Sequence, residues 1–107
     1  MNSLDKVRSW VEMGKQIGKA VRCERGEQPA WLSVGIQKWE GTYKLYISEI
    51  READMTAEKF IRNDLLSYAS FEKLLDAYPG QTVPIEELAP LKGQRLFNPR
   101  FKDYLYE

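Results

Sequence analysis

The chain has 107 residues, of which 43% are apolar and 30% are charged, and its formal net charge is zero. This length and composition are typical of one globular domain, residues 1–107, that folds without disulfides or a structural metal. Zero net charge argues against a protein that is basic throughout and coats nucleic acid, although it does not exclude a local basic patch.

The numbers of histidines and cysteines limit the kinds of catalytic and metal sites that the chain can form. Histidine is absent and Cys23 is the one cysteine. The commonest general base, the Ser-His and Cys-His nucleophile pairs, the usual zinc sites and an internal disulfide are therefore excluded. We expect a protein that is not an enzyme and holds no cofactor and no metal. The N-terminus lacks a signal-peptide pattern and no apolar run approaches roughly 18 residues, so we expect a soluble, cytoplasmic protein.

A helix is the first predicted element. At 100° per residue, one apolar stripe is formed by six side chains: Leu4, Val7, Trp10, Val11, Ile17 and Val21. Gly14 and Gly18 lie within the stripe, where they indicate close packing. The alternative is a helix that stops near Gly18, followed by extended residues. The next stretch, residues 23–30, is polar, contains Gly26 and Pro29 and is predicted to be a loop.

Residues 31–50 predict a β-hairpin. If Glu40 and Gly41 form a two-residue turn, Trp39 pairs with Thr42 and Trp31 pairs with Ile50. One face then holds an apolar set suited to a core: Leu32, Val34, Ile36, Tyr43, Leu45 and Ile47. A shift by one residue would make both faces mixed, so the hydrophobic pattern selects this register.

The rest of the chain predicts shorter elements. We expect a third strand near residues 65–69, then a short helix that Ser70 caps and Pro79-Gly80 ends, then one further helical turn near Pro84. The tail is rich in rings and is predicted to be a final strand or a docked extended segment. The expected fold is α+β: an N-terminal helix and a short helix packed on a small antiparallel sheet, in the order α-β-β-β-α, with an irregular aromatic C-terminal segment.

The second face of the hairpin carries Trp31, Trp39 and Tyr46 around Gly35. Two explanations remain open for these rings. In the first, the C-terminal segment covers them with its own apolar residues: Leu96, Phe97, Phe101, Tyr104 and Tyr106. In the second, the rings are exposed and bind a partner, because Trp, Tyr and Arg dominate binding hot spots.

Charge is unevenly distributed along the chain. Residues 52–87 hold three basic and eight acidic side chains, a net charge of −5, whereas residues 88–102 hold four basic side chains and no acid. The acidic region is suited to attract a basic partner. The basic tail and the basic side of the first helix are suited to phosphates.

These patterns predict a non-catalytic protein-binding domain. Its simplest form is a small inhibitor of immunity-protein or antitoxin type that neutralises a basic partner enzyme such as a toxin nuclease. The expected partner-binding residues are Trp31, Trp39 and Tyr46 for contact area, and Glu52, Asp54, Glu58 and Asp64 for charge. The alternative is a single-stranded nucleic-acid-binding domain in which the three rings stack on bases. A homodimer joined through the aromatic face is a third interpretation, and no membrane partner is expected.

Overall fold

The computed structural model describes residues 3–78, 83–93 and 95–105. An N-terminal helix, α1 (Ser3–Glu12), precedes four strands: β1 (Ile17–Arg25), β2 (Gln28–Trp39), β3 (Thr42–Arg51) and β4 (Phe60–Tyr68). The 3-10 turn η1 (Glu52–Asp54) joins β3 to β4, and α2 (Phe71–Ala77) follows. A second 3-10 turn, η2 (Ile85–Glu87), leads into the two-residue strand β5 (Ala89–Pro90).

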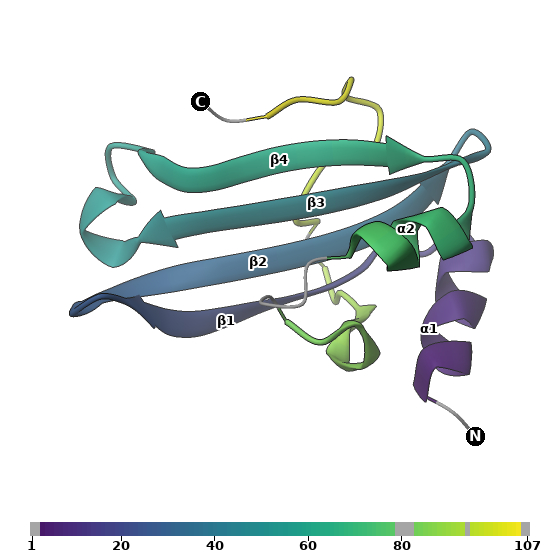
Figure 1. Ribbon diagram of the computed structural model, residues 1–107, viewed down its shortest axis with the longest axis horizontal. Coiled ribbons are helices and arrows are strands. Elements are labelled where there is room, and N and C mark those ends of the chain that lie inside the picture. Colours follow the sequence, from purple (N-terminus) through teal and green to yellow (C-terminus); the bar gives the residue numbers. More distant parts are fainter. Residues whose placement is uncertain (1–2, 79–82, 94, 106–107) are drawn as a thin grey trace.

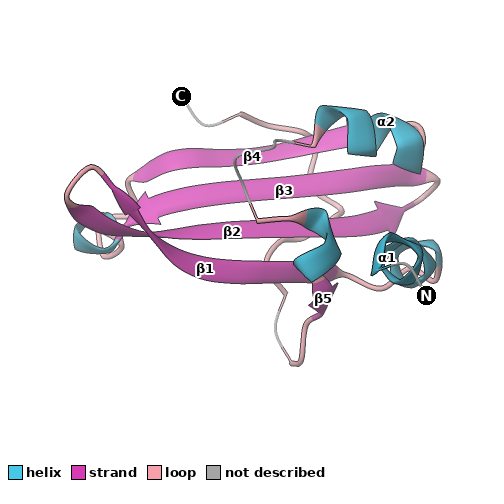
Figure 2. Cartoon of the chain, turned by 60° about the horizontal axis from the view of Figure 1, so that its bottom comes forward, coloured by secondary structure: helices cyan, strands magenta, loops and turns pink. Residues whose placement is uncertain are grey.

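The strands form one antiparallel sheet in the order β4-β3-β2-β1-β5. Figure 1 shows α1 and α2 in front of this sheet, while the C-terminal segment, in yellow, crosses behind it. Figure 2 shows β5 beside β1 at one edge. The α+β class, with two helices packed on a small antiparallel sheet, is thus confirmed. We call the side that carries the helices the helix face and the opposite side the tail face.

The predicted hairpin register is confirmed at every pair from Trp39–Thr42 to Trp31–Ile50. Glu40 and Gly41 both have positive φ, +49° and +82°, as a type I′ turn requires. The predicted apolar set is buried on the helix face together with residues of α1, α2 and η2. The principal core therefore lies between the sheet and the helices.

The helix predicted to reach Val21 ends at Glu12. Gly14 adopts φ +84°, which L side chains rarely do, and the Gly14 and Lys15 amides donate to carbonyls of the last helical turn. The following residues pair with β2 instead, with Ile17 opposite Ile36. The extended alternative is therefore correct beyond Gly18, and Gly14 ends the helix earlier than either interpretation expected.

Two further predictions need correction. The expected loop 23–30 contributes strand residues on both sides of a tight turn at Gly26 and Glu27, so the sheet gains β1. The third strand begins at Phe60 rather than near Leu65 and ends at Tyr68.

The predicted Ser70 cap of α2 is confirmed, because the Ser70 hydroxyl accepts a hydrogen bond from the Lys73 amide at 3.1 Å. The predicted Pro79-Gly80 stop and Tyr106 lie outside the described residues.

Candidate protein-binding surface

The C-terminal segment, residues 91–93 and 95–105, crosses the tail face and continues along the outer edge of β4 (Figure 1). At the centre of this face Phe97 is stacked on Tyr46, with ring centroids 5.4 Å apart and ring planes at 12°. Both rings are buried, in a small cluster with Leu65. The explanation in which the segment covers the aromatic face therefore holds for Tyr46.

Two glycines permit this close approach. A Cβ built on Gly35 would lie 2.9 Å from the Phe97 ring, and one on Gly18 would lie 2.6 Å from Leu96 and 2.8 Å from the Val34 carbonyl oxygen. The pairs Gly18–Gly35 and Gly35–Tyr46 are adjacent across the sheet. The two glycines thus leave a surface without side chains beside Tyr46, and Leu96 and Phe97 pack against that surface.

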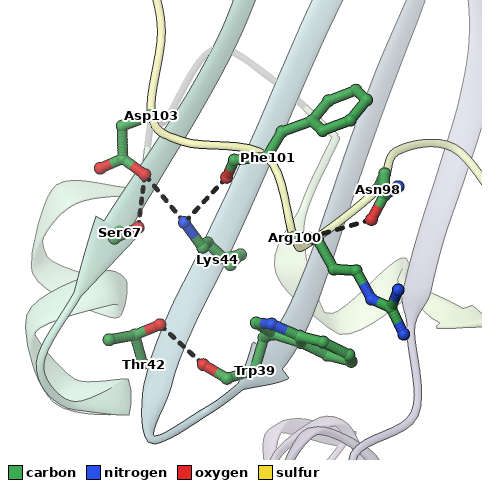
Figure 3. Close-up of polar contacts among 8 residues, drawn as sticks. All are labelled: Trp39, Thr42, Lys44, Ser67, Asn98, Arg100, Phe101 and Asp103. Atoms are coloured by element: carbon green, nitrogen blue, oxygen red, sulfur yellow. Dashed lines mark hydrogen bonds and ion pairs between the residues drawn. The ribbon is translucent and has the colours of Figure 1, made fainter.

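A nearly buried lysine anchors the next part of the segment. The side chain of Lys44 is 11% exposed, and its Nζ lies 3.0 Å from Asp103 Oδ1 and 3.3 Å from the Phe101 carbonyl oxygen (Figure 3). Asp103 also accepts a hydrogen bond from the Ser67 hydroxyl. Burial acts to raise the pKa of Asp103, but the hydrogen bonds from Ser67 and Lys44 together hold it below its ordinary value.

Trp39 is covered in part by Arg100 of the C-terminal segment. The Arg100 guanidinium sits 5.3 Å from the centroid of the Trp39 ring, at a distance suited to a cation–π contact (Figure 3). The backbone amide of Arg100 donates to Asn98 Oδ1 at 3.0 Å, which shapes the turn that delivers the guanidinium. Trp39 is therefore half-buried rather than free.

The segment ends its described course as a partner of β4. Leu65 and Tyr104 exchange two backbone hydrogen bonds of 2.8 and 2.9 Å at the edge of the sheet. Burial raises the pKa of the Tyr104 hydroxyl, with smaller contributions from Tyr46 and Asp64. These bonds give the edge strand a partner from its own chain at that point.

The anchored segment presents apolar side chains to solvent. Phe101 is 58% exposed, Leu105 is 62% exposed and Tyr104 is 36% exposed. Arg100 and Lys102, which flank Phe101, are exposed too. Exposed apolar side chains with basic neighbours on a hydrogen-bonded backbone lose little further conformational entropy on binding. We call these exposed residues of one short stretch, Arg100, Phe101, Tyr104 and Leu105, the tail cluster.

Trp31 lies at the far end of the same face. Eight residues separate it from Trp39 along β2, which corresponds to about 26 Å at about 3.3 Å per residue. Its indole Nε1 donates to Glu52 Oε1 at 3.0 Å, and Arg22 Nε lies 2.7 Å from the same oxygen. The Arg22 hydrogen bond is the main reason that the pKa of Glu52 is lowered.

The remaining predicted acids do not share one surface. Asp54 Oδ2 lies 4.0 Å from Arg51 Nη1. Asp64 is buried and pairs with Arg62 at 2.6 Å, and its partner in the sheet is Ile47, which places it on the helix face. Glu58 is exposed in the turn before β4, where its φ is +54°. The seven predicted residues therefore fall into separate groups, with Tyr46 covered.

The sequence pattern predicts only a covering role for Phe101 and Tyr104. It predicts no individual contact role for Arg100 or Leu105. The available signal was the mixture of basic and apolar residues in the stretch from Arg100 to Leu105. A helix-like or strand-like period would have identified one buried side, but this stretch has neither.

Comparison of the chain with protein-family models, with curated proteins and with solved structures finds no match in any of the three. Within residues 3–78, 83–93 and 95–105, no three metal-binding side chains gather into a site. The helices in the same ranges include none long and apolar enough to cross a membrane. The residues themselves therefore carry the functional argument.

Proposed function

We propose that the protein is a non-catalytic domain that binds another protein through the tail cluster. The observation that carries the proposal is the exposure of Phe101 and Leu105 on a segment whose backbone is held by Lys44 and Leu65. Exposed apolar side chains on a fixed backbone are suited to anchor an interface, because little conformational entropy is lost when they bind.

The finer form of the proposal is an inhibitor of immunity-protein or antitoxin type that acts in the cytoplasm on a basic enzyme such as a toxin nuclease. Among the predicted acids, Glu52, Asp54 and Asp64 already face arginines. Glu58 is exposed and has no ion-pair partner among the described residues. Glu58 is therefore the acid best placed to speed the approach of a basic partner.

Single-stranded nucleic-acid binding on the sheet face is less well supported. Phe97 occupies the face of Tyr46 on which a base would stack, and Arg100 lies over Trp39. The predicted basic side of the first helix, which was expected to hold phosphates, does not form as expected. Lys19 and Arg22 lie on β1 instead, where they pair with Glu87 and Glu52.

The proposal is tested by affinity capture from the native lysate with the wild-type chain and with a Phe101→Ser, Leu105→Ser variant. One protein should be recovered in stoichiometric amount by the wild type and lost by the variant. The matched control is Met13→Ser, which removes an exposed apolar side chain from the turn just after α1. Equal recovery by all three chains would contradict the role of the tail cluster.

The inhibitor form has its own test. If the captured protein is a nuclease, its activity should fall in proportion to added wild-type chain. Glu58→Gln should slow association at low salt and leave dissociation unchanged, because an exposed charge outside the contact acts mainly on the rate of encounter. Sizing of the isolated chain separates these outcomes from a homodimer, which would itself occupy the exposed cluster.

A further inference from the structure

A cleft of about 480 Å³ lies between the loop after α1 and the C-terminal segment. It is lined by Lys15, Gln16 and Gln37 on one side and by Pro90, Leu91 and Arg95 on the other. None of these residues belongs to the tail cluster. The volume falls in the range of roughly 300–1,000 Å³ that is typical of small-molecule sites.

The cleft is positively charged without compensation. Lys15 and Arg95 are both exposed, and no carboxylate of the described residues pairs with either. Some basic residues elsewhere do have such partners, as Lys19 has Glu87 and Arg62 has Asp64. None of the described residues that line the cleft is acidic. Two unpaired cations at one cleft therefore favour an anionic ligand.

Two glutamines give this cleft a fixed wall. Gln16 Nε2 donates to Gln37 Oε1 at 2.8 Å and to the Phe97 carbonyl oxygen at 3.0 Å, and its Oε1 accepts the Leu96 amide at 2.8 Å. Gln37 is buried, and its Nε2 donates to the Gly14 carbonyl oxygen at 3.1 Å. A primary amide carries two N–H donors, and Gly14 is the one acceptor found for this amide within the described chain.

We propose that this cleft binds a small molecule through a phosphate group, as a mononucleotide would be bound. Arg95 offers a planar fork that matches phosphate oxygens, and Lys15 supplies a second positive charge. Pro90 and Leu91 provide an apolar wall for the uncharged part of the ligand. The site is independent of protein binding by the tail cluster, so either proposal can fail alone.

The test is a titration followed by amide NMR at constant ionic strength, with AMP and inorganic phosphate as probes. AMP should shift the amides of Lys15, Gln16 and Leu91 saturably, and phosphate should shift those of Lys15 and Gln16 more weakly. Arg95→Gln and Lys15→Gln should each weaken AMP binding about tenfold. Lys73→Gln removes an exposed lysine on α2 that has no ion pair in the described chain, and it should leave binding within about twofold.

Three results would overturn the proposal. The first is the absence of saturable shifts at AMP concentrations up to about 10 mM. A dissociation constant above that concentration would be weaker than a formed site gives. The second is an equal loss in Lys73→Gln, because the effect would then be general charge attraction. The third is binding of a ten-residue oligothymidylate without binding of AMP, which would favour nucleic acid as the ligand. Amide spectra of each free variant verify that the fold is retained.

Discussion

The ring of Phe97 lies stacked on the ring of Tyr46, 5.4 Å between centroids, over a strand position where Gly35 has no side chain. This relationship joins residues 51 positions apart in the chain and decides what the tail face can do. With Phe97 in place, the aromatic residue at the centre of the face is buried. Three of the exposed large apolar side chains of the described residues belong to the tail cluster: Phe101, Tyr104 and Leu105.

Removal of the Phe97 ring should weaken the fold and release the segment. Phe97→Ala removes a buried ring, so we expect the free energy of unfolding in urea to fall by about 3 kcal/mol. Trypsin should also cut more rapidly at Arg95, Arg100 and Lys102, because the segment loses a main contact with the sheet.

Phe101→Ala is the matched control for this experiment, since it removes the same side chain from an exposed position of the same segment. Its free energy of unfolding should change by at most about 0.5 kcal/mol. An equal loss in both variants would show that the Phe97–Tyr46 stack is not the main attachment.

Removing Asp103 and removing Lys44 should lower the free energy of unfolding by different amounts. Asp103→Ala leaves the ammonium of Lys44, with its side chain 11% exposed, beside the Phe101 carbonyl alone, and should cost about 1–3 kcal/mol. Lys44→Met leaves a carboxylate that is 45% exposed and still accepts from Ser67, so its cost should be smaller. Urea unfolding of both variants gives the order, and the reverse order would contradict the anchoring role of Lys44.

The attachment of the segment should depend on pH through Asp103. Its pKa is lower in the folded chain than in the unfolded chain, where it is about 3.9. The stability contributed by the carboxylate is therefore present above about pH 4 and is lost as the pH falls through the lower folded value. Hydrogen exchange of the Tyr104 amide should accelerate over that acidic window in the wild type. Asp103→Asn should show fast exchange already at neutral pH; a protected amide in that variant would exclude Asp103 as the titrating group.

The turn at Glu40 and Gly41 offers a stabilising substitution. Glu40 has φ +49°, a conformation that asparagine adopts more readily than glutamate. Glu40→Asn should raise the free energy of unfolding by about 0.5–1 kcal/mol without changing the register. The measurement is urea unfolding beside Glu27→Asn, an exposed glutamate in the other tight turn without a positive φ. A destabilised Glu40→Asn variant would mean that the turn is held by contacts other than its backbone preference.

Much of the fold was predictable because its rules are local. The hairpin register follows from alternation and from one turn, and the α2 cap follows from one serine. The strand β1 was predicted only as an extended alternative to the helix, because Ile17 and Val21, four residues apart, fit a helical stripe as well as one face of a strand. The positive φ of Gly14 ends the helix before Ile17, so that Ile17 and Val21 follow the strand period in β1.

The candidate site was less predictable because it depends on contacts between distant segments. Trp31, Trp39 and Tyr46 were placed on the correct face, but the cover of Tyr46 depends on a segment with no period of its own. The pairing of Asp64 with Arg62 two residues away turns a predicted interface charge into a compensated one. The net charge of residues 52–87, counted along the sequence, is therefore larger than the uncompensated negative charge that a partner would meet.

The most direct test of the account is the dissociation constant of the purified partner for the wild-type chain and for the Phe101→Ser, Leu105→Ser variant, measured by titration calorimetry. Two interface anchors together should raise the dissociation constant about 100-fold or more, while Met13→Ser should leave it within about twofold. A change of less than about threefold in the double variant, with its fold intact, would contradict the claim that the tail cluster is the binding surface.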